Sequence, residues 1–258
     1  MQKQEALSYE EQFGDAPLYF NSFAVHSTGI IKAQTLLKVD TYNLACVPYQ
    51  FSMKRGILAG AFSKDEIAFF QRFKDSLAGL GLVFQRPDER SPMKIFCRCQ
   101  ISAIAMMKEK ESVGLIVCDW KPIPPDLAAV LGEHLLLLER LKLEFGDFKD
   151  RLVPITPDSA KKLGFNNYAI MTCAAGQQKL ALFSISVNKL EFLMPLRSAD
   201  LVAGEKVSFA LFFQRYRFSV SGDITGSERL PTGVQRGRAA IDFSPELVQL
   251  LEEYYVGH

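Results

Sequence analysis

One segment with residues that could bind a phosphate is Arg236-Gly237-Arg238, a loop that enters the last apolar strand near the C-terminus. Two guanidinium groups beside a glycine can bind a phosphate, because each group offers several N–H donors and glycine allows the backbone to approach closely. A solvated loop would produce the same pattern, and Lys54-Arg55 leaves the same two interpretations open. The sequence therefore allows an anion-binding role here without requiring it.

Patterns that predict catalysis or metal binding are missing from the sequence. Ser184 and Ser186 have no neighbouring histidine with an orienting acid, which a nucleophilic serine needs. Cys97 and Cys99 share a strand face, but no second pair of ligands is spaced to complete a zinc site. Phosphate-binding glycine loops of the Walker or Gly-x-Gly-x-x-Gly type are also missing. We therefore expect a protein that is not an enzyme, with no catalytic residues, no metal and no cofactor.

The totals indicate a folded cytoplasmic protein. The chain has 258 residues, and its 30 Lys and Arg nearly balance its 29 Asp and Glu, for a net charge of +1. This balance disfavours a DNA-coating protein, which needs many cations, so we expect no DNA partner. No apolar run approaches the roughly 20 residues that span a bilayer, and no secretory signal is visible. The five cysteines are odd in number, which favours reduced thiols and a cytoplasmic location.

The first part of the chain predicts a mainly β domain, residues 1–146, that ends with a helix. Ser63 and Glu66 form a capping box ahead of apolar residues at helical spacing, and Gly79 and Gly81 supply a stop signal. Short apolar stretches separated by turn residues are typical of strands. The elements expected are strands between 19 and 59, an inserted helix over 63–81, strands at 94–105 and 113–120, and a closing helix over 125–144.

The second part, residues 147–258, predicts a small barrel. Thr156 and Pro157 start a helix that Gly164 ends, and a last helix begins at Ser244-Pro245. Six strands are predicted in this short segment, and a flat sheet built from them would leave two edge strands with unpaired backbone groups. Closure of the sheet into a barrel removes both edges. The strands are expected at 168–173, 179–187, 190–194, 206–213, 216–225 and 239–243. The fold class is therefore α+β, mainly β, with two six-stranded antiparallel barrels that a C-terminal helix closes.

An internal repeat supports two related domains. Residues 113–135 and 238–255 both read as an apolar strand, an Asp-aromatic pair, a proline turn and a helix. We match Asp119-Trp120 with Asp242-Phe243. Similarity at such a separation indicates a duplicated structural unit.

The second unit resembles the PilZ family, whose members are six-stranded barrels that bind cyclic di-GMP. Leu180–Val187 followed by Leu190–Pro195 resembles the family's strand, turn, strand and proline. Ala203–Phe209 resembles its Ala-Gly-Glu-x-Val strand entry, and Phe218–Ile224 resembles its Phe-x-Val-x-Gly-x-Val strand. Ala240–Phe243 resembles its last strand. The first unit could be a diverged copy, with residues 50–56 in place of the family's serine turn.

The resemblance implies a cyclic di-GMP site, with two departures from the family's motifs. Lys161-Lys162 stands where the family has Arg-x-x-x-Arg. The family's Asp/Asn-x-Ser-x-x-Gly turn keeps its serine as Ser186 but begins with Ser184 and ends with Lys189. The residues expected to bind the ligand are Lys161, Lys162, Ser184, Ser186, Asn188, Arg236 and Arg238.

The resemblance implies a non-catalytic regulatory protein in bacterial cyclic di-GMP signalling. It would act as an atypical receptor or as a degenerate adaptor that works through protein contacts. A protein partner in a motility, secretion or envelope complex is expected in either case. Two alternatives remain open at this point: a protein–protein interaction module with no nucleotide ligand, and an enzyme on an unrelated β fold.

Overall fold

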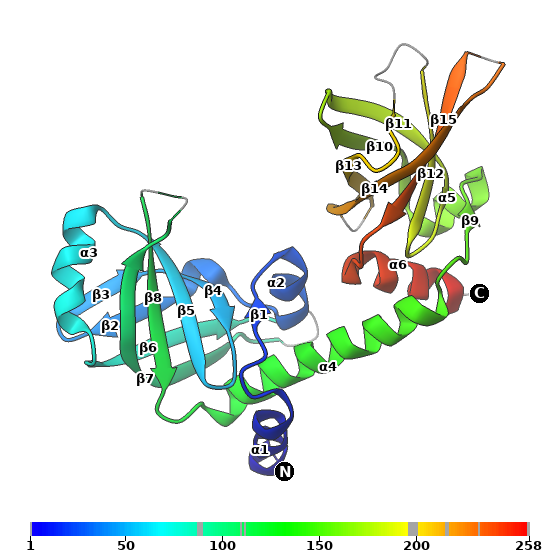
Figure 1. Cartoon of the computed structure of the whole chain (residues 1–258). Helices are drawn as coiled ribbons and strands as arrows, with labels where there is room; N and C mark the ends of the chain where they lie inside the picture. The colour runs from blue at the N-terminus through cyan, green and yellow to red at the C-terminus, as the bar shows by residue number, and fades with distance from the viewer. Residues whose placement is uncertain are drawn as a thin grey trace. The chain divides into compact units, whose positions relative to one another are not determined.

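The chain forms two compact units, unit 1 (Met1–Leu137) and unit 2 (Leu138–His258), shown in Figure 1. The computed structural model describes residues 2–86, 90–108, 110, 112–195, 201–214, 217–231 and 233–256. The division falls inside helix α4 (Pro125–Asp147), and the predicted boundary after residue 146 falls near the end of the same helix. None of the helices in the described ranges is long and apolar enough to cross a membrane.

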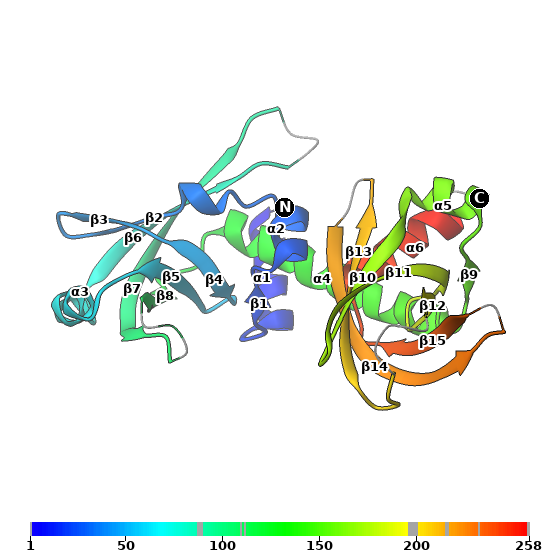
Figure 2. The same ribbon diagram turned by 90° about the horizontal axis from the view of Figure 1, so that it is seen from above.

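Unit 2 contains the closed six-stranded barrel that the sequence predicts (Figure 2). Its described strands are β10 (Phe165–Cys173), β11 (Gly176–Ile185), β12 (Lys189–Pro195), β13 (Lys206–Phe213), β14 (Arg217–Arg229) and β15 (Val234–Ile241). They pair in the order β10-β13-β14-β15-β12-β11, and β11 pairs back with β10. The short strand β9 (Val153–Pro154) adds to β11. Tyr216, the predicted start of the fifth strand, lies outside the described residues.

The core of unit 2 follows from strand alternation and from one amphipathic helix. On β13, Phe209 and Leu211 are fully buried while Ala210 between them is half-buried, as the two-residue period requires. Helix α6 (Pro245–Val256) starts where Ser244 Oγ accepts a hydrogen bond from Leu247 N at 3.3 Å. Its four buried apolar residues each contribute about 1.5–3 kcal/mol of burial free energy. They are Leu247, Val248, Leu250 and Leu251.

Unit 1 has the same strand order, with one strand bent into two pieces. Its described strands are β1 (Leu18–Tyr19), β2 (Leu36–Val39), β3 (Tyr42–Ala45), β4 (Val47–Phe51), β5 (Arg55–Ala61), β6 (Leu77–Phe84), β7 (Met93–Met106) and β8 (Val113–Trp120). They pair in the order β1-β4-β5-β8-β7-β6-β2-β3. Only Cys46 separates β3, which pairs with β2, from β4, which pairs with β5. If β3 and β4 are counted as one strand, the six strands of unit 1 form a closed ring. Strand β1 pairs with β4 outside this ring, as β9 pairs with β11 in unit 2.

The helices repeat as well. Helix α2 (Ser22–Thr28) and helix α5 (Pro157–Leu163) each follow the added strand and precede the first barrel strand. Asn21 and Thr156 cap their N-termini, and Gly29 and Gly164 end them in the left-handed conformation. The start of α4 packs into the core of unit 1 through apolar residues, including Leu131. The remaining helices are α1 (Gln2–Phe13), the 3-10 turn η1 (Lys32–Gln34), α3 (Lys64–Phe70) and the 3-10 turn η2 (Gln71–Phe73).

The internal repeat is therefore present, but the residues matched from the sequence are out of register. Trp120 N donates to Lys54 O at 3.0 Å, and Ile241 N donates to Asn188 O at 2.8 Å. These bonds occupy the same place in the two barrels, so Trp120 corresponds to Ile241. The match of Asp119-Trp120 with Asp242-Phe243 was wrong because it aligned residue types, whereas strand pairing sets the register.

The inserted helix is shorter than predicted. The capping box of Ser63 and Glu66 is present, but the helical segment α3–η2 ends at Phe73. Residues 77–84 form strand β6, in which Leu80 and Leu82 are buried. The prediction to residue 81 was wrong because the two-residue alternation after Leu77 outweighs the helical spacing before it.

Candidate functional site

The turn between β11 and β12 is built around Ser186, whose side chain is fully buried. Ser186 Oγ accepts a hydrogen bond from Lys189 N at 3.0 Å and donates one to Asn188 Oδ1 at 3.0 Å. Asn188 Oδ1 also accepts a hydrogen bond from Asp150 N at 3.0 Å. These bonds fix the turn and use hydrogen-bonding groups that a ligand would otherwise reach.

The segment around Asp150 lies against this turn. The Asp150 carboxylate pairs with Lys189 Nζ and accepts a hydrogen bond from Asn188 Nδ2 at 3.4 Å. These hydrogen bonds from Lys189 and Asn188 hold the pKa of Asp150 below its usual value. Lys161 and Lys162 lie exposed in the last turn of α5, and no described interaction joins them to the turn.

A second cluster lies on the outer face of β11, β12 and β15, and we name it the arginine face: Phe183, Glu191, Arg236 and Arg238. Arg236 Nη2 donates to Glu191 Oε2 at 2.7 Å, and Ser184 Oγ donates to the same oxygen at 2.9 Å. Arg236 Cζ lies 4.3 Å from the centroid of the Phe183 ring, within the range of a cation–π contact. Arg238 is the cross-strand partner of Glu191 and pairs with Glu228 at 3.6 Å.

The two arginines lie within strand β15 and not in a loop, as the alternating burial of that strand shows. Gly237 between them faces the core, where the Phe192 ring leaves no room for a Cβ. The glycine is therefore required for packing inside the barrel. The two arginines share the opposite, outer face because side chains alternate along a strand.

Electrostatics keep Glu191 ionised. Burial of the carboxyl group opposes ionisation, but hydrogen bonds from Arg236 and Ser184 outweigh it and hold the pKa of Glu191 below its usual value. Arg236 Nε is buried and has no hydrogen-bond partner among the described residues. Arg236 thus keeps an unused donor beside an anionic partner.

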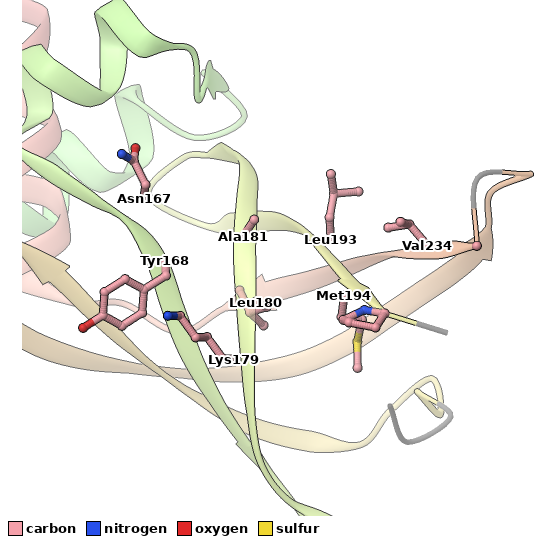
Figure 3. A pocket seen from close by; sticks show the side chains of 10 residues that line it. Asn167, Tyr168, Lys179, Leu180, Ala181, Leu193, Met194 and Val234 are labelled. Atoms are coloured by element: carbon pink, nitrogen blue, oxygen red, sulfur yellow. The ribbon is translucent and has the colours of Figure 1, made fainter. Parts of the chain in front are cut away.

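Unit 2 also has a hollow of about 450 Å³, whose lining side chains Figure 3 shows. Its lining comes from four strand regions and is mostly apolar: Asn167, Tyr168, Lys179, Leu180, Ala181, Leu193, Met194, Pro195, Gly233 and Val234. Leu193 pairs in register with Arg236, which joins the hollow to the arginine face. Lys179 Nζ lies 4.4 Å from the centroid of the Tyr168 ring. The hollow therefore offers an apolar surface with cations on two sides.

Unit 1 repeats the turn but not the charges. Arg55 N donates to Ser52 Oγ at 3.2 Å and Ser52 N donates to Arg55 O at 2.8 Å, as Lys189 and Ser186 do in unit 2. From this anchor, strand register matches three charged residues of unit 2 with apolar residues of unit 1. The matched pairs are Glu191 with Ile57, Arg236 with Leu115, and Arg238 with Val117. The counterpart face of unit 1, Tyr49, Ile57, Leu115 and Val117, cannot attract an anion.

This arrangement suits binding of an anion that also carries a flat ring. Arginine forks suit phosphate oxygens, and apolar hollows suit rings. In the described ranges of the chain, no group of three or more His, Cys, Asp or Glu residues could hold a metal ion. Of the residues predicted from the sequence, the structure brings Ser184, Arg236 and Arg238 together around Glu191, whereas Glu191 and Phe183 were not predicted. The hairpin could have indicated Glu191, because it stands opposite Ser184 across the turn.

Comparison with solved structures finds proteins that the chain resembles over most of its length, and three of them are described here. PlzA of Borreliella burgdorferi in complex with c-di-GMP has 15% identity, covers 98% of this chain and 99% of its own, and gives a TM-score of 0.47. YcgR of Escherichia coli in complex with c-di-GMP has 12% identity, with coverages of 96% and 93% and a TM-score of 0.31. The inhibitor of motility MotI (DgrA) of Bacillus subtilis has 8% identity, with coverages of 89% and 97% and a TM-score of 0.32. Comparison with curated proteins gives no match.

A family model described as the PilZN3 domain matches residues 4–139. The matched range contains all the strands of unit 1 and the first part of α4. The resemblance to PilZ proteins is thereby confirmed, although most of the motifs quoted for it lie in unit 2. Because the match spans more than half of the 258 residues, the chain belongs to the PilZN3 domain family.

Proposed function

We propose that the chain is a non-catalytic regulatory protein of cyclic di-GMP signalling and that unit 2 binds the dinucleotide as an atypical receptor. Cyclic di-GMP carries two phosphates, which need cationic donors, and two guanine bases, which need flat or apolar surfaces. Membership of the PilZN3 domain family and the PilZ-like motifs of unit 2 support this ligand. The proposed binding residues are Ser184, Arg236 and Arg238. Lys161, Lys162, Ser186 and Asn188 stay predictions from the sequence, because Ser186 and Asn188 make their hydrogen bonds within the turn and no described interaction joins the two lysines to it.

The observation that carries the proposal is the position of Arg236 over the Phe183 ring, with Arg238 on the same face of strand β15. A guanidinium fork can donate two parallel hydrogen bonds to one phosphate. The stacked Arg236 and Phe183 also offer a flat surface to a guanine. No cluster of comparable charge stands on the counterpart face of unit 1, so the proposal assigns binding to unit 2 alone.

Calorimetric titration of the full chain with cyclic di-GMP tests this function. We expect saturable heat from the wild type and about 10- to 100-fold weaker binding by Arg236→Gln, because a hydrogen bond to a charged group contributes about 1.5–3 kcal/mol. Arg217→Gln is the matched control, since Arg217 Cζ lies 5.0 Å from the Phe212 ring centroid in the same barrel but off the arginine face. A folded wild-type protein that gives no heat would contradict the receptor role.

A second function, a protein-interaction module with no nucleotide ligand, is favoured by the apolar counterpart face of unit 1. Tyr49 is 41% exposed there, beside Val47 at 40%. In that case the partner belongs to a motility, secretion or envelope complex. A purified partner that binds equally well with and without cyclic di-GMP, and that Tyr49→Asp releases, would favour this module.

A cytoplasmic location is also part of the proposal. Cys46, Cys97, Cys99 and Cys118 are buried free thiols, and Cys173 is a free thiol that is partly exposed. Free thiols persist in reducing compartments, which supports the cytoplasm.

A further inference from the structure

Glu191 stands between the groups that the ligand would need. A single carboxylate oxygen of Glu191 accepts hydrogen bonds from both Arg236 Nη2, at 2.7 Å, and Ser184 Oγ, at 2.9 Å. The Glu191 side chain is 18% exposed and the Arg236 side chain 29%. The pair is therefore partly shielded from water, and solvent weakens it less than an exposed ion pair.

The ion pair with Glu191 orients the Arg236 side chain but does not use all of its hydrogen-bond donors. Its guanidinium lies over the Phe183 ring, and its Nε donor is buried with no partner in the described part of the chain. An incoming phosphate that binds the Arg236 guanidinium would also approach the Glu191 carboxylate. Two anions on one guanidinium repel each other, and the repulsion is stronger in a partly buried site than in water.

We propose that Glu191 is an internal competitor of the ligand phosphate for Arg236, so that the dinucleotide binds as the Arg236–Glu191 pair opens. This inference rests on the proposed function of unit 2, and it assigns Glu191 the role of setting the affinity of the site. Opening the pair transfers the guanidinium donors from carboxylate to phosphate and leaves Ser184 Oγ free to donate to either group.

The duplicated unit supports a role tied to the arginines. In unit 1 the counterpart of Glu191 is Ile57, and the counterparts of Arg236 and Arg238 are Leu115 and Val117. The carboxylate is thus present in the copy that has the arginines and replaced in the copy that lacks them. Unit 1 forms the same strand pairing with Ile57 at this position, so the barrel fold itself does not require a carboxylate there.

The test compares Glu191→Gln with the wild type by calorimetric titration with cyclic di-GMP. Glutamine keeps the shape and an acceptor for Ser184 Oγ, and it removes the competing charge. We expect about tenfold tighter binding by Glu191→Gln. Glu191→Asp withdraws the charge by one methylene and should give an intermediate affinity. Asp223→Asn, which removes an exposed carboxylate paired with Lys206 at 3.2 Å, should bind as the wild type does.

A ligand-independent readout accompanies the titration. Phenylglyoxal modifies free guanidinium groups, so modification at Arg236, measured by mass spectrometry, should be faster in Glu191→Gln than in Asp223→Asn. Wild-type binding with equal or weaker binding by Glu191→Gln would overturn the inference and leave the proposed function standing. Absence of binding by every folded variant would overturn the proposed function and this inference with it.

Discussion

His134 shows at the scale of one residue how burial sets protonation in this chain. It lies on α4 in the core of unit 1, where its Nδ1 is 2.6 Å from Ser27 Oγ and its ring lies 5.7 Å from that of Phe23. Burial disfavours the charged imidazolium and lowers the pKa of His134 to about 4. The neutral ring is therefore the form that the folded unit holds.

This shift predicts acid sensitivity of unit 1. The unfolded chain takes up a proton at His134 near pH 6.5, whereas the folded chain resists it down to about pH 4. The contribution of the neutral His134 ring to the free energy of unfolding is fully present above pH 6.5. As the pH falls from 6.5 to about 4, the free energy of unfolding decreases by about 2–3 kcal/mol. Denaturation followed by the fluorescence of Trp120, the single tryptophan, measures it.

The comparison for this prediction is His134→Leu, which replaces the imidazole with an apolar side chain and so removes the titration. The variant should lose less stability than the wild type between pH 7 and pH 4.5, because other titrating groups are common to both proteins. Identical pH dependence in the two proteins would show that His134 does not carry the effect.

At the scale of elements, the glycines that end α2 and α5 form a matched pair. Gly29 has φ 72° and Gly164 has φ 66°, so both adopt the left-handed conformation that disfavours a side chain. The surroundings differ. A Cβ on Gly29 would lie 2.8 Å from the Gln85 carbonyl carbon and closer still to its oxygen, whereas on Gly164 the nearest atom, Gln214 Cβ, is 3.4 Å away.

We expect Gly164→Ala to destabilise unit 2 by about 1–2 kcal/mol, the cost of a left-handed alanine. Gly29→Ala should destabilise unit 1 by roughly 1–3 kcal/mol more, because a rigid backbone carbonyl must move. Urea denaturation gives the free energy of unfolding of each variant. Trp120 fluorescence reports on unit 1, and circular dichroism reports on both units. Equal losses of stability in the two variants, or a larger loss in Gly164→Ala, would show that the Gln85 carbonyl does not restrict position 29.

The sequence predicted the elements whose signals are local. The caps at Ser63, Thr156 and Gly164 and the strands around residues 94–105 and 113–120 are present as expected. The prediction failed where two periodicities met, after Phe73, and where pairing partners lie far apart in the chain. Glu191 contacts Arg236 across two strands that 38 residues separate, and no local pattern encodes that contact.

At the scale of the whole molecule, two barrels with one topology have diverged in their outer faces. Both keep the serine turn, the added strand and the capped helix before the first barrel strand. Unit 2 has arginines and a glutamate on the outer face of its strands, and unit 1 has apolar residues at the matched positions. A dinucleotide should therefore bind unit 2 and leave unit 1 unoccupied.

Hydrogen–deuterium exchange of the full chain with and without cyclic di-GMP is the most direct test, because it maps where the ligand acts. If unit 2 binds the ligand, peptides from β11, β12 and β15 should exchange more slowly with ligand present, whereas exchange in β4, β5 and β8 of unit 1 should not change. Protection centred on the unit 1 strands, or no protection anywhere at saturating ligand, would contradict binding by unit 2.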